Sequence, residues 1–397
     1  MAVAAADRGG AVRSGTSLLY NPALRQFVYQ ALTVVFVVWL FWFAGTNAAD
    51  NLARANMTAG FDFLGSRAGF DIAQTPIAYT SDSSYMRALM LGLVNTLIVA
   101  FTGIITATII GLLVGIGRLS NNWLIARLST VYVEVFRNIP PLLVIFFWYK
   151  GVLSLLPDVK QSLNLPLSVF VSNRGIYMPA PVFGEGIGLV VVAFVIAVIG
   201  AILYSRWATK KQLATGKRPP VLYVNLGLII GLPLLAFLLI GSPVTFDIPE
   251  LGKFNMRGGT VIGPEFLSLY MALSFYTAAF IAEIVRAGIR GVSKGQSEAA
   301  NALGIRSGLA TRLVILPQAL RIIIPPLTSQ FLNLTKNSSL AVAIGYADLV
   351  AVGGTILNQS GHSIEIIAIW MMIYVSISLM TSLFMNWFNA KMALVER

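Results

Sequence analysis

Residues 297–304 read Ser-Glu-Ala-Ala-Asn-Ala-Leu-Gly, and nine residues after the glycine comes Val314-Ile315-Leu316-Pro317. This segment is polar and rich in alanine, whereas the sequence on both sides of it is strongly apolar. Glutamate and alanine have high helix propensity, Ser297 can serve as an N-cap, and Gly304 can adopt the positive φ that ends a helix. The pattern therefore predicts a short helix, a sharp turn and a second helix between two membrane spans.

The composition of the whole chain indicates the same class of protein. Of its 397 residues, 57% are hydrophobic and only 11% are charged, and the mean hydropathy is +0.78. A chain this apolar is typical of a membrane protein with several spans. Lys and Arg outnumber Asp and Glu by 28 to 16, which in a membrane protein indicates cytoplasmic loops and not nucleic-acid binding. Because the chain has no cysteine and one histidine, we expect no catalytic site and no metal site.

Eight segments are long and apolar enough to cross about 30 Å of hydrocarbon as helices. Backbone groups cannot stay unpaired in lipid, so we predict an all-α polytopic fold. The first segment is longer than the apolar part of a cleavable signal and is interpreted as a retained span. Pro140-Pro141 would open the third span and Pro325-Pro326 the seventh. The predicted spans cover about 27–44, 89–117, 138–156, 187–204, 221–241, 265–288, 325–347 and 364–388.

Lys and Arg are divided unevenly between two sets of connections. One set holds 19 of them and the other holds eight. By the positive-inside rule the first set faces the cytoplasm, and the even number of spans agrees with this orientation. Both termini and the segment 297–317 are therefore predicted to be cytoplasmic. The basic set comprises residues 1–26, 118–137, 205–220, 286–321 and the tail after 388.

Polar residues form a line within the predicted seventh span. Lys336 lies roughly 16 Å along that helix, near the middle of the membrane. The side chains around it follow i, i+4, i+7 spacing and predict a polar stripe that faces the interior of the bundle. The stripe comprises Ser329, Asn333, Lys336, Asn337 and Leu340.

A second intramembrane charge, Glu283, lies near the cytoplasmic end of the sixth predicted span. Ionisable residues inside a membrane are candidates for a transport path, and a zwitterionic substrate could place its carboxylate at Lys336 and its ammonium group at Glu283. Two structural alternatives remain open. Glu283 could pair with Arg286 three residues later, or with Lys336 as a bridge between helices.

The segment 297–317 resembles the EAA loop of ABC importer permeases. That loop reads EAA, three residues, Gly, nine residues and then I-x-LP. Three further blocks, residues 132–143, 281–288 and 333–340, resemble permeases of the polar amino-acid uptake family and occur in the same order. The long form with eight spans is most similar to the larger, Q-type permease of the general L-amino-acid (Aap or Bzt type) systems. The matching loop residues are Glu298, Ala299, Ala300, Gly304, Leu316 and Pro317, with Val314 in place of isoleucine.

This resemblance implies a five-helix type I ABC importer permease core within residues 87–388. The core would comprise 89–156 and 265–388, interrupted by an insertion, 157–264, that carries two further spans. Residues 1–86 would supply a cytoplasmic segment, the first span and a periplasmic loop, and 389–397 a cytoplasmic tail.

The resemblance also implies partners. Cytosolic ATPase subunits would dock on the EAA-like loop, a second homologous permease would complete the path, and a periplasmic amino-acid binding protein would deliver the substrate to the bacterial inner membrane.

The sequence contains no G-x-x-x-x-G-K-[ST] motif, because Gly216-Lys217 is followed by Arg218 and Gly252-Lys253 by Phe254. We therefore expect no ATPase activity and no cofactor in this chain, with ATP and Mg²⁺ held by the partner. Two other functions remain as alternatives. One is an ion-coupled secondary amino-acid transporter with Glu283 as the ion site, and the other is a membrane scaffold without transport. Neither needs the EAA spacing.

Overall fold

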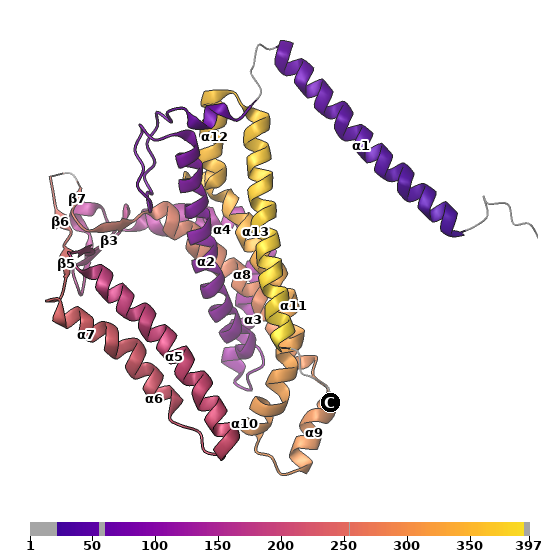
Figure 1. The fold of residues 1–397 in the computed structure, drawn as a ribbon, viewed down its shortest axis with the longest axis vertical. Coiled ribbons are helices and arrows are strands. Elements are labelled where there is room, and N and C mark those ends of the chain that lie inside the picture. Colours follow the sequence, from indigo (N-terminus) through magenta and orange to yellow (C-terminus); the bar gives the residue numbers. More distant parts are fainter. Residues whose placement is uncertain (1–21, 55–59, 254, 393–397) are drawn as a thin grey trace, which may run out of the picture.

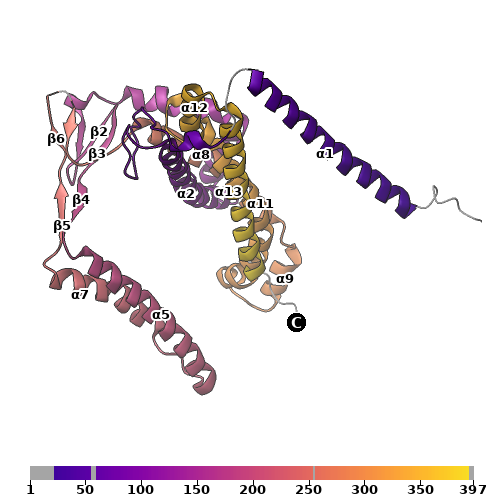
Figure 2. The ribbon, with the colours of Figure 1, turned by 45° about the horizontal axis from the view of Figure 1, so that its top comes forward.

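The computed structural model describes residues 22–54, 60–253 and 255–392, and most of this part of the chain is helical (Figure 1). Within it, seven helices are long and apolar enough to cross a membrane, or eight if one bent pair counts as a single span. The predicted polytopic helical fold is confirmed. Helix α1 (Pro22–Arg54) contains the first predicted span, and in both ribbon views it stands apart from the other helices (Figures 1 and 2).

The centre of the bundle is the contact between α2 (Tyr85–Gly117) and α8 (Pro264–Arg290). A Cβ atom at Gly111 would come within 2.6 Å of the Ile281 side chain, and one at Gly115 within 2.7 Å of the Ala282 carbonyl oxygen. Glycine at these positions lets the two backbones approach closely, which is how helices associate in lipid. The buried core extends from this contact to α11 (Leu316–Asn337).

The chain bends sharply at the proline pair where the third predicted span begins. Helix α3 (Trp123–Asn138) and the helical segment Pro141–Leu155, which begins with α4 (Pro141–Phe146), meet at 111°. Pro141 opens α4 as predicted, whereas the helix in the connection before it, residues 118–137, was not predicted. Most of that region is helical, because Asn122 caps α3 with its Oδ1 atom, which accepts hydrogen bonds from the next helical N–H groups.

The seventh span is longer than predicted. Helix α10 (Ser307–Ala310), a π-helical turn (Thr311–Ile315), α11 and a 3₁₀ turn (Ser338–Ile344) form one run of 38 residues from Ser307 to Ile344. Pro325 and Pro326 lie inside α11, so the prediction that they start the span was wrong. A proline pair is tolerated inside a membrane helix because neighbouring helices and local turn adjustments satisfy the freed carbonyl groups.

The last part of the chain contains two helices where the sequence predicted one. Helix α12 (Leu349–Ser360) occupies the connection that was expected to be a loop, and α13 (Ser363–Met392) contains the last predicted span. Asp348 caps α12, with its Oδ1 atom accepting a hydrogen bond of 2.8 Å from the Ala351 N–H. The cap, together with burial of Leu349 and Ile356, explains why this short apolar stretch is helical.

The segment predicted to be an insertion, 157–264 and called the insertion below, consists of a helical hairpin and a small β subdomain. The hairpin is α5 (Ile187–Thr215) against α6 (Val221–Leu226), a π turn (Gly227–Gly231) and α7 (Leu232–Leu239). A four-stranded antiparallel sheet, in the order β1-β2-β3-β8, joins the two arms of the insertion, and two smaller pairs accompany it. The strands, which the sequence reading did not predict, are β1 (Leu163–Leu165), β2 (Val169–Ser172), β3 (Gly175–Met178), β4 (Ala180–Phe183), β5 (Val244–Asp247), β6 (Glu250–Leu251), β7 (Met256–Arg257) and β8 (Thr260–Ile262).

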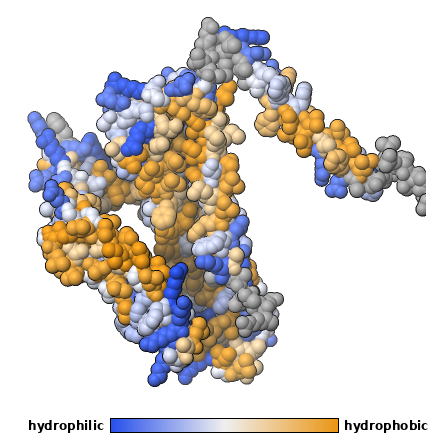
Figure 3. All heavy atoms as spheres, in the orientation of Figure 1, coloured by the Kyte–Doolittle hydropathy of each residue, from blue (hydrophilic) through white to orange (hydrophobic). Residues whose placement is uncertain are grey.

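The elements separate into two ends. The α9–α10 region and the turn between α5 and α6 lie at the lower end in Figure 1, while the strands and α12 lie toward the upper end. Hydrophilic residues gather at these ends, and hydrophobic residues cover the hairpin and the sides of the bundle (Figure 3). This distribution matches a band of lipid around the middle of the molecule.

Candidate functional site

The predicted loop consists of α9 (Lys294–Ala302), a glycine turn and α10. The Ile305 N–H donates to the Ala300 carbonyl at 3.0 Å, and the Gly304 N–H donates to the Asn301 carbonyl at 2.9 Å. These two bonds make a Schellman motif, and Gly304 has the left-handed φ of +68° that this motif needs. The predicted helix, turn and second helix are thus present.

The start of α9 differs from the prediction. Ser297 lies inside the helix, because α9 begins at Lys294 and its N-cap is Ser293. The sequence Ser293-Lys294-Gly295-Gln296 is polar and does not interrupt the helix, so the first turn forms upstream of the serine that we had expected to cap it.

Neighbouring alanines of the loop differ in exposure. Ala300 is buried, whereas Ala299 and Glu298 are exposed. Two leucines of the same loop are exposed as well, Leu303 to 78% and Leu313 to 66%. Exposed apolar side chains on a polar segment are available for contact with another protein.

Val314, Leu316 and Pro317 lie where the loop enters the long helical run. Pro317 has no N–H to donate, and the chain makes a π-helical turn just before it, closed by the Leu316 N–H donating to Thr311. Gln318, near the start of α11, connects this segment to α9 through hydrogen bonds. Its Nε2 atom donates to the Val314 carbonyl at 3.1 Å and to Oε1 of Gln296 at 3.3 Å. The sequence reading missed this glutamine pair, which no short motif identifies.

Glu283 belongs to a cluster of charges at the end of α8 nearest α9. Its carboxylate forms ion pairs with Arg118, at the end of α2, and with Arg286, whose Nε atom donates to Oε2 at 3.1 Å. Arg118 also approaches Glu134 of α3, 3.7 Å away. The pairing of Glu283 with Arg286 is therefore confirmed. Among the described residues, Glu283 forms no ion pair with Lys336. Sequence spacing could suggest Arg286 but not Arg118, which comes from another helix.

The polar stripe of α11 faces away from the rest of this chain. Ser329, Asn333 and Lys336 are exposed and Asn337 is half-buried, while Leu334 and Thr335 are buried on the opposite face. The prediction that the stripe faces the interior of this chain's bundle was wrong. Among the described residues Lys336 has no ion-pair partner. A charge on a membrane-spanning helix is costly in lipid, so the stripe needs water or another chain beside it.

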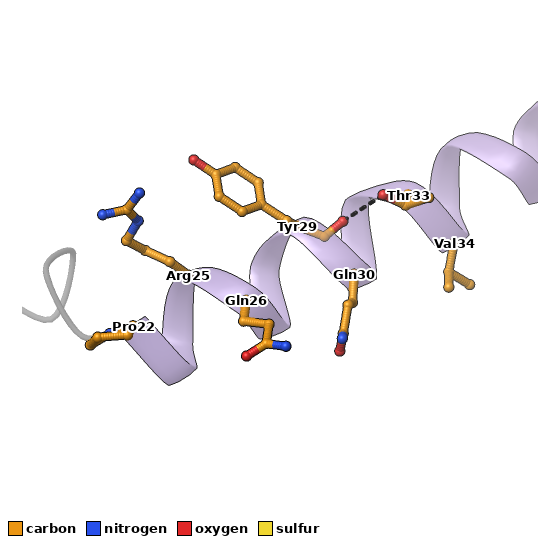
Figure 4. A pocket seen from close by; sticks show the side chains of 7 residues that line it. All are labelled: Pro22, Arg25, Gln26, Tyr29, Gln30, Thr33 and Val34. Carbon is orange, nitrogen blue, oxygen red and sulfur yellow. Dashed lines mark hydrogen bonds between the residues drawn. The ribbon is translucent and has the colours of Figure 1, made fainter. Parts of the chain in front are cut away.

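A shallow hollow of about 660 Å³ lies along the first turns of α1. The described residues that line it all come from that one helix, as the seven side chains labelled in Figure 4 show. Thr33 is engaged with its own helix, donating to the Tyr29 carbonyl at 2.8 Å. We therefore assign no site there.

Comparison with known proteins identifies similar chains along nearly the whole length. The family model described as binding-protein-dependent transport system inner membrane component matches residues 219–394. The chain is 63% identical over 381 residues to the general L-amino acid transport system permease protein AapQ of Rhizobium johnstonii, covering 96% of this chain and 95% of that protein.

Two further relatives have similar coverage. The putative amino-acid ABC transporter permease protein YhdX of Escherichia coli is 48% identical, covering 96% of this chain and 98% of that protein. The glutamate/glutamine/aspartate/asparagine transport system permease protein BztB of Rhodobacter capsulatus is 44% identical, covering 96% of both chains.

Proposed function

We propose a specific role for this chain, which belongs to the family of binding-protein-dependent transport system inner membrane components: it is the membrane-spanning permease subunit of an ATP-driven importer of L-amino acids. The substrate class follows from the relatives named above. One observation carries the mechanism. The helical run from Ser307 to Ile344 contains the end of the exposed loop and the polar stripe, so movement at one end is transmitted to the other.

The docking of a cytosolic ATPase is supported by the surface of the loop. Exposed Leu303 and Leu313 supply apolar contact area, and exposed Glu298 supplies a charge for an arginine or backbone N–H of the partner. Buried Ala300 and the Gly304 turn hold α9 and α10 together, so the loop can move as one rigid unit when the ATPase moves. ATP and Mg²⁺ belong to the ATPase, because this sequence has no Walker lysine.

A second, homologous permease is supported by the exposure of the α11 stripe. Two such stripes facing each other would enclose a polar path, in which Lys336 meets the substrate carboxylate and Asn333 and Asn337 offer amide groups. Glu283 stands at the cytoplasmic end of this path, where it holds Arg118 and Arg286.

A periplasmic binding protein would approach the opposite end, where the β subdomain and α12 lie. This arrangement has both termini in the cytoplasm and the chain in the bacterial inner membrane. ATP-driven closure of the ATPases draws the loops together and opens the path outward, and hydrolysis resets it.

Copurification tests this assignment directly. The tagged chain is extracted from its native host in mild detergent, and the proteins that accompany it are identified by mass spectrometry. We expect a Walker-containing ATPase and a second permease. The variant Glu298→Arg with Gly304→Asp should lose the ATPase and keep the permease, whereas Lys294→Gln, at the start of α9 but outside the EAA spacing, should keep both.

The runner-up function gives a different result. An ion-coupled secondary transporter would purify without an ATPase in every variant, and its amino-acid uptake would collapse when an uncoupler removes the ion gradient. Uptake that requires ATP and persists with the uncoupler excludes that alternative.

A further inference from the structure

A cavity of about 820 Å³ lies where the inserted sheet meets the core, at the outer end of the molecule. Its walls include segments that are distant in sequence: residues 73–76, part of α2, the β2–β3 turn, the stretch 259–266 that joins β8 to α8, and Tyr346. The volume is within the range of roughly 300–1,000 Å³ that is usual for small-molecule sites. Because each segment is anchored in a different part of the fold, the cavity exists only when insertion and core are assembled.

Two of the lining residues are charged, and they have opposite signs. Arg174, in the β2–β3 turn, is exposed to the cavity and forms no ion pair with any residue in the described part of the chain. Glu265, in the first turn of α8, has an uncharged hydrogen-bond partner, the hydroxyl of Tyr149, whose oxygen lies 3.4 Å from Oε1. Each charge can therefore still bind an oppositely charged group of a ligand.

The side of the cavity nearest the core is rigid. The Asn95 side chain is buried, and its Nδ2 atom donates to the carbonyls of Gln74 at 3.1 Å and Ala347 at 2.9 Å. Tyr346 is also buried, and its hydroxyl donates to the Asn95 carbonyl at 3.2 Å. These satisfied polar groups keep the lining in place without a ligand, so the cavity is preformed.

We propose that this cavity is a second, outer binding site for free α-amino acids, separate from the stripe on α11. The proposal rests on the proposed function, which supplies the substrate class. A zwitterion matches a cavity with one cation and one anion, the carboxylate binding Arg174 and the ammonium group binding Glu265. A phosphate or a metal cation would be attracted by one of these charges and repelled by the other.

The site also gives the insertion a role. Arg174 belongs to the inserted sheet and Glu265 to the core, so a bound amino acid would bridge the two and hold the sheet against the end of the path. Occupancy would therefore report the external amino-acid concentration to the permease.

Equilibrium binding tests the proposal. The full chain is placed in lipid nanodiscs without ATPase or binding protein, and radiolabelled L-glutamine is the probe. We expect saturable binding that is competed by L-glutamine and not by N-acetyl-L-glutamine or L-glutamine amide, each of which lacks one charge. Arg174→Gln and Glu265→Gln should each weaken binding about tenfold or more, because each removes a charge-assisted hydrogen bond.

Two control variants locate the binding. Arg67→Gln removes another exposed arginine of the outer end, which pairs with Asp82 at 2.7 Å outside the cavity, and should leave binding unchanged. Lys391→Met removes a charge from the last turn of α13, away from the cavity lining, and should also leave it unchanged. If Lys336→Met abolishes binding while Arg174→Gln does not, the amino acid binds on the α11 path and the proposal is overturned.

Cysteine protection supplies a measurement that does not require the charge variants to fold. The chain has no cysteine of its own, so Thr260→Cys, in the cavity wall, and Asn164→Cys, exposed at the other edge of the same sheet, each create a single reactive thiol. L-glutamine should slow maleimide labelling at position 260 and not at 164. Equal labelling rates with and without L-glutamine at both positions overturn the proposal.

The measurements test the outer amino-acid site separately from the importer assignment. Loss of ATP-dependent uptake concerns the importer assignment and is measured with the whole assembly, whereas binding is measured on this chain alone. If Arg174→Gln and Glu265→Gln weaken association of the periplasmic binding protein and no free amino acid binds, the cavity is a protein-docking surface and the proposal fails.

Discussion

Gly304 shows how one backbone conformation determines the shape of a whole loop. Its φ of +68° closes the Schellman motif, and nothing lies within 4 Å of the position where a Cβ would stand. A substitution there is therefore opposed by backbone conformation and not by lack of space. Among other residues asparagine adopts this conformation most readily.

We predict that Gly304→Ala destabilises the loop by about 1 kcal/mol through the cost of the left-handed conformation, and that Gly304→Asn costs less. The measurement is ATPase stimulation in the assembled importer, together with hydrogen exchange of the α9–α10 amides. Gly308→Ala is the matched control, because Gly308 lies in α10 at a negative φ with open space around it. Equal effects of the two alanine substitutions would contradict the argument.

Asp348 is a buried carboxyl group between the 3₁₀ turn and α12, outside the helices long enough to span the membrane. Oδ1 accepts the capping bond from Ala351, but Oδ2 is buried without a hydrogen-bond partner. Burial raises the pKa of Asp348 from 3.8 to about 6.

We predict from this pKa that Asp348→Asn stabilises the protein at pH 8. A carboxyl group whose pKa is raised by folding contributes stability below pH 4, and that contribution is lost as pH rises through about 6. The loss corresponds to about 3 kcal/mol, and asparagine keeps the capping oxygen without the charge. The apparent Tm of the variant should exceed that of the unaltered protein at pH 8 and converge with it near pH 4. A lower Tm for the variant at pH 8 would count against the assignment.

At the scale of elements, close helix contacts determine which surfaces of this chain are its core. Four of the five glycines of α2, at 92, 103, 111 and 115, could have indicated a bend, but α2 is one continuous helix. Its glycines instead face neighbouring chain segments, and those at 111 and 115 face α8 at distances that no side chain would allow.

We predict that Gly111→Ala destabilises the bundle by about 1–3 kcal/mol, because the added methyl group overlaps the Ile281 side chain. Gly188→Ala is the control, since a Cβ at that helical position of α5 would meet nothing within 4 Å. Thermal unfolding in nanodiscs measures both. If the two variants unfold at the same temperature, α2 and α8 are not packed as closely as described.

At the scale of the whole molecule, the exposed stripe on α11 supports the proposal that a second permease completes the transport path. We predict that Lys336→Met lowers amino-acid uptake by tenfold or more, because the carboxylate loses a charge-assisted hydrogen bond. The partner subunits should still copurify, since the loop is unchanged. Lys391→Met, at the far end of α13, is the matched control and should retain uptake. Full uptake with Lys336→Met would remove this residue from the path.

The insertion was predictable only in part. Its apolar hairpin explains two of the predicted spans, but its sheet pairs residues from both arms, for example Ile176 with Ile262. Strands of two to four residues leave little periodicity in a sequence, so this part of the fold could not be predicted.

The sequence by itself determined the membrane class, seven of the eight spans in outline, the helix-turn-helix loop with its left-handed glycine, and the family. These depend on local properties: hydropathy over about 20 residues, helix propensity and the freedom of glycine. Only the tertiary structure decided that the chain bends by 111° at Pro140-Pro141, whereas Pro325-Pro326 does not interrupt α11. It also decided that Glu283 binds Arg118 and that the Lys336 stripe faces away from the rest of this chain. Each of these depends on which helices lie beside one another, and a contact between distant segments leaves no pattern in either segment alone.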